Sequence, residues 1–66
     1  PTDLNPGDLN FGITNLIKTY VEHKELSYQT INDILGALSG ATHEFYRRVV
    51  IPYENEAIKR NGDVYE

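Results

Sequence analysis

The chain has 66 residues, a formal net charge of −4 and no cysteine. This length allows one domain with one small core, and the lack of cysteine excludes disulfides and Cys-based zinc sites. The acidic balance disfavours nucleic acid as a partner, because affinity for a phosphate backbone comes from Lys and Arg. Chains of this size often need additional stabilisation, and self-association is the form of it that remains here.

The sequence also lacks a recognisable metal-binding motif and a membrane-spanning segment. His23 and His43 stand in no zinc-binding motif, so we expect no metal and no cofactor. No apolar run approaches the length of about 20 residues that a membrane span needs. The first ten residues include Asp3 and Asp8 and lack the apolar segment of a signal peptide. We therefore expect no membrane association.

The first predicted element is a helix over residues 6–24, after a flexible lead-in at residues 1–5. Asn5 is suited to cap this helix, Pro6 to take its first position, and Asp8 to interact with the positive end of its dipole. The apolar residues that follow recur at intervals of three and four, as on one face of a helix. They are Leu9, Ile13, Leu16, Ile17, Tyr20 and Val21.

A second helix is predicted over residues 27–51, with Ser27 as its cap. Gly36 and Gly40 each cost roughly 1 kcal/mol in a helix interior, but the periodicity on both sides of them favours a continuous helix. Its apolar face consists of Ile31, Ile34, Leu35, Leu38, Ala41, Phe45 and Val49.

Pro52 lacks a backbone donor and crowds the carbonyl of Arg48. The sequence therefore predicts either a kink in one long helix or the start of a third helix, and Asn61-Gly62 predicts its end. Residues 6–66 are thus expected to form a single small all-α domain. We expect a helical hairpin with a short third helix or a kinked continuation after Pro52, completed by oligomerisation.

Small and polar residues form a stripe on the second helix beside its apolar face. Gly36, Ser39, Gly40 and His43 belong to this stripe, and small side chains allow another backbone to come close. The neighbour could be the first helix, a second copy of the chain, or a ligand. We take these four residues as a candidate interface.

The positive charge and the aromatic rings that could hold a ligand lie next to each other. Arg47 and Arg48 are adjacent arginines suited to carboxylates or phosphates, and Tyr46 and Tyr53 could stack a base. The alternative is an ordinary surface ion pair, because Glu44 and Arg48 are four residues apart on a helix. We take the two arginines and two tyrosines as a candidate binding site for a nucleotide phosphate.

Catalysis has no support in the pattern. His43 and Glu44 are adjacent and point about 100° apart on a helix, so neither can orient the other. Ser27 and Ser39 lie in no nucleophile motif. We expect a protein that is not an enzyme.

Three stretches carry a resemblance to a known group of proteins. They are LSYQTIND with GAL (residues 26–38), FYRRVVIPYE (residues 45–54) and NGDVY (residues 61–65). Together they resemble a family of short proteins of unknown function from tailed bacteriophages and prophages. The resemblance implies a phage origin and a place in the cytoplasm of a bacterial host cell, and it implies no activity.

Two functions follow as expectations. The first is a non-enzymatic helical interaction module that forms a homo-oligomer and binds a host or phage protein. The alternative is a sponge that sequesters a nucleotide signal of host defence through the Arg47 and Arg48 patch. This alternative is an analogy of size and origin.

Overall fold

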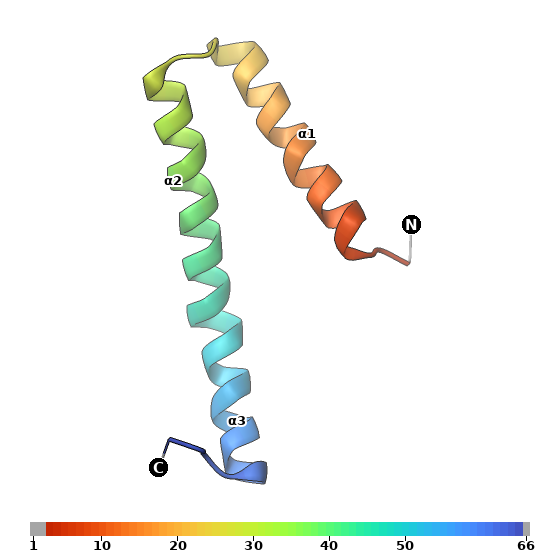
Figure 1. Ribbon diagram of the computed structural model, residues 1–66, viewed down its shortest axis with the longest axis vertical. Coiled ribbons are helices and arrows are strands. Elements are labelled where there is room, and N and C mark those ends of the chain that lie inside the picture. Colours follow the sequence, from red (N-terminus) through yellow and green to blue (C-terminus); the bar gives the residue numbers. More distant parts are fainter. Residues whose placement is uncertain (1–2, 66) are drawn as a thin grey trace. The chain divides into compact units, whose positions relative to one another are not determined.

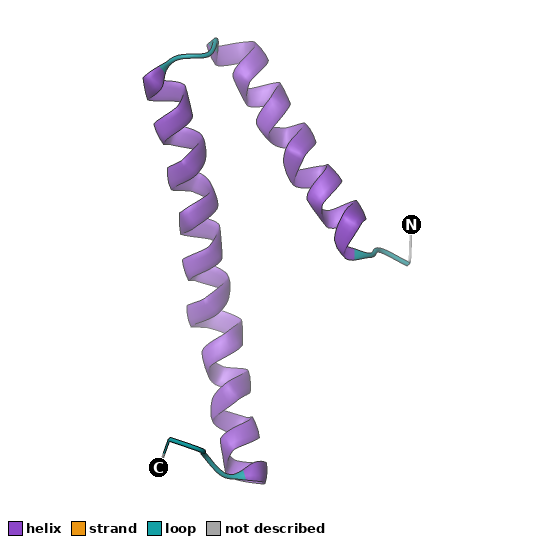
Figure 2. Cartoon of the chain, viewed as in Figure 1, coloured by secondary structure: helices purple, strands orange, loops and turns teal. Residues whose placement is uncertain are grey.

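The computed structural model describes residues 3–65, and within them it is helical without any strand (Figures 1 and 2). The helices are α1 (Pro6–Lys24), α2 (Tyr28–Phe45), the π-helical turn η1 (Tyr46–Val50) and α3 (Ile51–Asn61). The all-α class is confirmed, with two helices joined at a tight turn. The chain divides into two compact units between Leu35 and Gly36.

Helix α1 begins and ends where the sequence predicts. The Asp8 N–H donates to Asn5 Oδ1 at 2.9 Å, and the Asn5 N–H donates back to Asp8 Oδ2 at 3.1 Å. This reciprocal pair is a capping box, which satisfies two backbone donors at once. Of the predicted lead-in, residues 1 and 2 lie outside the described part and residues 3–5 are not helical. Its flexibility stays a prediction.

The turn after α1 has an uncommon backbone. Glu25 closes the helix by donating its N–H to the Val21 carbonyl at 2.8 Å, with φ at 65° and ψ at 148°. A side chain at such a φ is strained, because this region is mainly used by glycine. The strain at Glu25 needs compensation from the residues around it.

Thr30 supplies that compensation. Its hydroxyl donates to the Glu25 carbonyl at 2.7 Å and accepts from Ser27 Oγ at 3.1 Å. Its N–H donates to Ser27 Oγ at 3.1 Å, which confirms Ser27 as the cap of α2. Thr30 is 4% exposed and is the only buried residue among residues 3–65. The most enclosed point of the first unit is therefore a polar turn.

A second polar contact joins the two helices of the first unit. The Tyr20 hydroxyl donates to Asp33 Oδ2 at 3.2 Å, and Gln29 donates to Asp33 Oδ1 at 2.7 Å. Partial desolvation raises the pKa of Tyr20, and the hydrogen bond to Asp33 and its negative charge raise it further. The phenol therefore stays protonated and able to donate.

The predicted end of the second helix is wrong in one respect. α-Helical structure stops at Phe45 instead of reaching residue 51, and η1 follows. In η1 the Ile51 N–H donates to the Tyr46 carbonyl, five residues back. Pro52 cannot donate, and its ring would crowd the Arg48 carbonyl in a regular α-helix. The wider turn accommodates Pro52 by shifting the hydrogen bonds by one residue.

Helix α3 (Ile51–Asn61) follows η1 without a non-helical residue between them, so helical structure continues past Pro52. It begins at Ile51, directly after η1, with Pro52 in its first turn, where a missing donor is tolerated. It ends at Asn61, and Gly62 donates its N–H to the Ile58 carbonyl at 2.8 Å with φ at 85°. This positive φ requires glycine, so the predicted stop at Asn61-Gly62 is confirmed.

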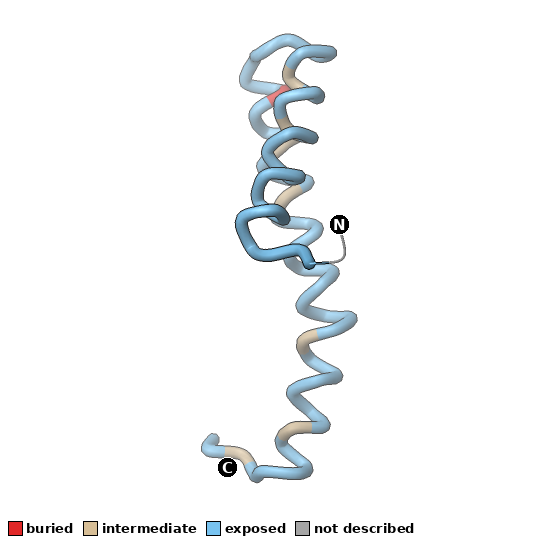
Figure 3. Tube along the Cα trace, turned by 90° about the vertical axis from the view of Figure 1, so that its right-hand side faces the viewer, coloured by how far each residue is buried: buried red, intermediate tan, exposed pale blue. Residues whose placement is uncertain are grey.

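Apolar burial is low in both units. No hydrophobic side chain is buried among residues 3–65, and the tube in Figure 3 is accordingly almost entirely pale blue. The most shielded apolar residues are half-buried: Ile17, Val21, Ile34, Leu38, Val50 and Ala57. Neither unit encloses a core of its own.

Candidate functional site

The two adjacent arginines share one carboxylate. Arg47 Nη2 lies 2.6 Å from Glu44 Oε1 and 3.0 Å from Oε2, and Arg48 Nε lies 2.8 Å from Oε2. Glu44 belongs to the last turn of α2 and both arginines to η1. The predicted Glu44–Arg48 pair is confirmed, and Arg47 joins it. One carboxylate thus offsets one of the two positive charges.

This ionic cluster is open to solvent. The Arg47 and Arg48 side chains are 66% and 73% exposed, and that of Glu44 is 50% exposed. Exposed ion pairs contribute about 0–1 kcal/mol, so they exchange partners readily. An incoming anion or carboxylate would therefore compete with Glu44 at low cost.

The aromatic part of the candidate binding site is less closely assembled. Tyr46 shares η1 with the arginines and Tyr53 follows in α3, and both rings are exposed. Among the described residues, no hydrogen bond joins either ring to Arg47 or Arg48. The structure thus brings the arginines together, and the role of the tyrosines stays a prediction.

The π turn is the feature of this region that sequence reasoning missed. π-Helical turns are rare and occur frequently at functional sites. The signal that could have revealed it is Pro52, placed just after a strongly periodic helix. The turn contains Tyr46, Arg47 and Arg48, so three of the four candidate ligand residues lie on it.

The small-residue stripe lies on α2 and is exposed at Gly36, Ser39, Gly40 and His43. Within the second unit, a Cβ added at Gly36 or Gly40 would meet no neighbouring atom within 4 Å. The glycines therefore do not serve a close approach inside their own unit. Their role in an interface stays a prediction.

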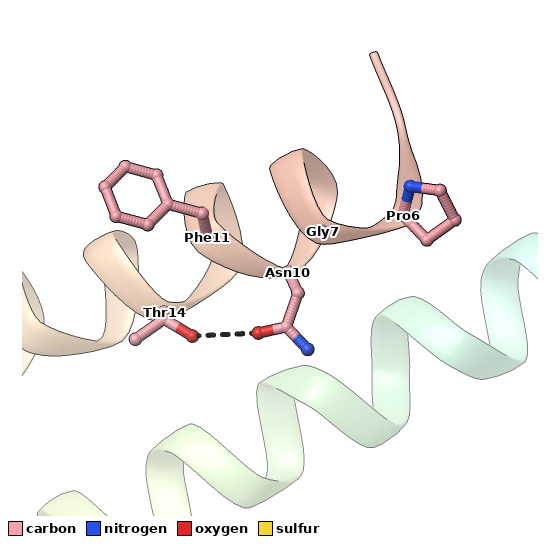
Figure 4. A pocket seen from close by; sticks show the side chains of 5 residues that line it. All are labelled: Pro6, Gly7, Asn10, Phe11 and Thr14. Carbon is pink, nitrogen blue, oxygen red and sulfur yellow. Dashed lines mark hydrogen bonds between the residues drawn. The ribbon is translucent and has the colours of Figure 1, made fainter.

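A shallow depression lies on α1, beside its first turns (Figure 4). Pro6, Gly7, Asn10, Phe11 and Thr14 line it, and the Thr14 hydroxyl donates to Asn10 Oδ1 at 3.2 Å. Figure 4 shows Phe11 pointing away from that hydrogen-bonded pair. No ionisable side chain lines the depression, so it offers no general acid or base.

The comparison with protein families gives one match. The model of a domain of unknown function, DUF6899, matches residues 2–64. The chain belongs to the DUF6899 family. No curated protein and no solved structure matches it.

Membership of DUF6899 brings no activity with it, and nothing in the match concerns bacteriophages, so a phage origin stays a prediction. Across residues 3–65 of this DUF6899 chain, no group of three His, Cys, Asp or Glu is placed to hold a metal ion. None of its described helices is long and apolar enough to cross a membrane.

Both units of this DUF6899 chain expose apolar side chains to solvent. In the first unit Leu9, Leu16 and Leu35 are exposed, and in the second unit Phe45 and Val49 are exposed. All five belong to the predicted apolar faces of their helices. In each unit, therefore, helix faces whose apolar periodicity is typical of buried surface are open to solvent.

Proposed function

We propose that the chain is a non-enzymatic helical interaction module that works as a homo-oligomer, most simply a dimer. The observation that carries this proposal is the exposure of the apolar helix faces. Phe45 is 60% exposed and Leu16 is 74% exposed, although both stand on strongly periodic apolar stripes. A second copy of the chain would cover them.

Burial of these exposed faces against a second copy would favour association. Burial of apolar surface contributes about 25 cal/mol per Å², and chains of this length bury too little on their own to be more than marginally stable. Large contiguous apolar patches on small proteins mark interaction sites. Self-association removes such patches from water and stabilises the fold in the same step.

From the resemblance to phage proteins we also propose where the module acts and what it binds. It acts in the cytoplasm of a bacterial host cell and binds a host or phage protein in addition to itself. The net charge of −4 favours a protein partner over nucleic acid.

The solution mass of the purified chain tests this proposal. We expect light scattering at micromolar concentration to give the mass of a dimer or a larger assembly, because the exposed faces associate. A monomer mass at every accessible concentration would contradict the proposal.

The alternative is a sponge for a nucleotide signal, and its support is the pair of exposed arginines on η1. Against it stands Glu44, which occupies both guanidinium groups. A micromolar ligand at about 100 times its dissociation constant stabilises the native state by roughly 2.7 kcal/mol. Each kcal/mol raises the Tm of a small domain by about 4–8 °C.

A thermal-shift screen of mono-, di- and cyclic nucleotides therefore decides the alternative. A binder should raise the Tm clearly at low salt, and the shift should shrink at high salt and vanish in Arg47→Ala and in Arg48→Ala. If no nucleotide moves the Tm by more than about 1 °C, the alternative is wrong.

A further inference from the structure

We propose that the second copy docks antiparallel on the second unit, about a two-fold axis at Pro52. The inference rests on the homo-oligomer proposed above and adds the orientation and the register. Its basis is a pattern of charge that is complementary to itself only in this arrangement.

The pattern is a row of residues four apart. Residues at this spacing lie along one ridge of a helix surface. The row that begins at Glu44 continues with Arg48, Pro52, Glu56 and Arg60. The charges run negative, positive, then negative, positive, with Pro52 at the centre. Reflection through Pro52 exchanges every charge for its opposite.

A two-fold axis at Pro52 and perpendicular to the helix relates the positions in this way. It places residues that are equally far from Pro52 opposite each other, so that Glu44 faces Arg60 of the other copy and Arg48 faces Glu56. The interface is isologous, so each pair occurs twice. All charges of the row then meet an opposite charge.

A parallel arrangement loses this complementarity. Two parallel helices face each other with opposite flanks, as the e and g positions of parallel coiled coils do. The other flank of this helix carries Tyr46, Val50 and Ile58 with the single charge of Glu54. Arg48 and Arg60 would then face mainly apolar side chains, so the antiparallel orientation is favoured.

The apolar surface needed for binding lies directly beside the charged row. The neighbouring row consists of Phe45, Val49, Tyr53 and Ala57. The first three are 60%, 50% and 67% exposed. This row is symmetric about Ile51, one residue from the axis, and the same two-fold brings large Phe45 near small Ala57. Large against small is the pairing that lets two helices pack closely.

The π turn contributes to both rows. In a regular α-helix four residues turn through about 400°, so a row drifts by about 40° at each step. A π turn holds more residues per turn, which reduces this drift. Because η1 covers residues 46–50, in the first half of both rows, it reduces their drift there and keeps that half closer to the face of the second half.

The ion pairs within the single chain leave the same charged groups able to bind the other copy. Arg48 pairs with Glu44 at 2.8 Å and Lys59 with Glu56 at 2.9 Å, and all four side chains are at least half exposed. Such pairs are weak, so the carboxylates can share a partner on the other copy. Charges of this kind set orientation and register more than affinity.

Charge reversal tests the arrangement on the full chain. An acidic variant carries Arg48→Glu and Arg60→Glu, and a basic variant carries Glu44→Arg and Glu56→Arg. Each alone places like charges opposite each other, so the dissociation constant of its dimer should rise about tenfold or more. Mixed in equal amounts, the two should form a heterodimer as tight as the wild type, measured by light scattering and native mass spectrometry.

A matched control changes the same charge elsewhere. Lys18→Glu with Lys24→Glu equals the acidic variant in net charge and changes only α1, so the row stays intact and the dimer should persist. Circular dichroism of each variant verifies that the helices form. If the acidic and basic variants dimerise like the wild type, or their mixture fails to recover, the antiparallel register is wrong while the homo-oligomer stands. A wild-type monomer would contradict both.

A distance measurement gives an independent result. The chain has no cysteine of its own, so Ser39→Cys accepts one nitroxide label per copy. Residue 39 lies 13 positions from Pro52, and a rise of about 1.5 Å per residue places two labels about 39 Å apart along an antiparallel pair. In a parallel pair in register the two labels lie at the same height along the helices, and only the interaxial distance of about 10 Å and the label arms separate them. A distance of about 39 Å or more in double electron–electron resonance supports the inference, and a clearly shorter distance overturns it.

Discussion

Phe45→Ala is expected to abolish self-association at micromolar concentration. Phe45 is the largest side chain without a polar atom in the row of Phe45, Val49, Tyr53 and Ala57, and it is 60% exposed in the single chain. Aromatic residues at the centre of an interface typically cost about 2 kcal/mol when truncated. A two-fold interface loses the residue twice, and about 4 kcal/mol corresponds to roughly a thousandfold weaker dissociation constant.

The chain offers a matched control, because it has two phenylalanines. Phe11 is 68% exposed on α1, outside the periodic apolar face of that helix. Phe11→Ala should therefore leave the mass of the assembly unchanged by light scattering. Loss of association in both variants would mean that α1 is also part of the interface, and loss in neither would show that Phe45 lies outside it.

Thr30→Val is expected to lower the free energy of unfolding by about 2 kcal/mol. Valine keeps the shape of threonine and removes the hydroxyl that bonds both the Glu25 carbonyl and Ser27. A buried polar group that loses its partner costs about 1–3 kcal/mol, and Glu25 has a strained backbone that depends on this contact. At about 4–8 °C per kcal/mol, the Tm should fall by roughly 10 °C.

Urea unfolding followed by circular dichroism measures this change. Thr30→Ser is the control, because serine keeps the hydroxyl and loses only a methyl group. It should cost clearly less than Thr30→Val. Equal losses in the two variants would mean that packing of the methyl group, and not the hydrogen bonds, makes Thr30 important.

Local chemistry determined the helix boundaries that the sequence predicts correctly. Asn5 and Ser27 cap because their side chains accept from backbone N–H groups within the next turn. Gly62 ends α3 because it adopts a positive φ. The Glu44–Arg48 pair follows from a spacing of four on a helix. Each of these depends on residues close in sequence, so no knowledge of the fold is needed.

The end of the second helix depended on more than propensity. Apolar periodicity predicts a helix to residue 51 but cannot distinguish α from π hydrogen bonding. The backbone around Pro52 has to satisfy its carbonyls without one donor, and that balance placed η1 over residues 46–50. The row of charges around Pro52 can be read from the sequence as a spacing of four. How closely its members keep to one face of the helix depends on the π turn.

By itself, then, the sequence determined which segments are helical, which residues form their apolar faces, and where the helices start and stop, except for the change from α to π structure at residues 46–50. The tertiary structure decided that Thr30 is the enclosed residue of the turn, that Tyr20 bonds to Asp33, and that the apolar faces are open within each unit. The reason is physical. Capping and periodicity act over one or two turns, whereas burial and contacts between helices depend on which side chains meet in space.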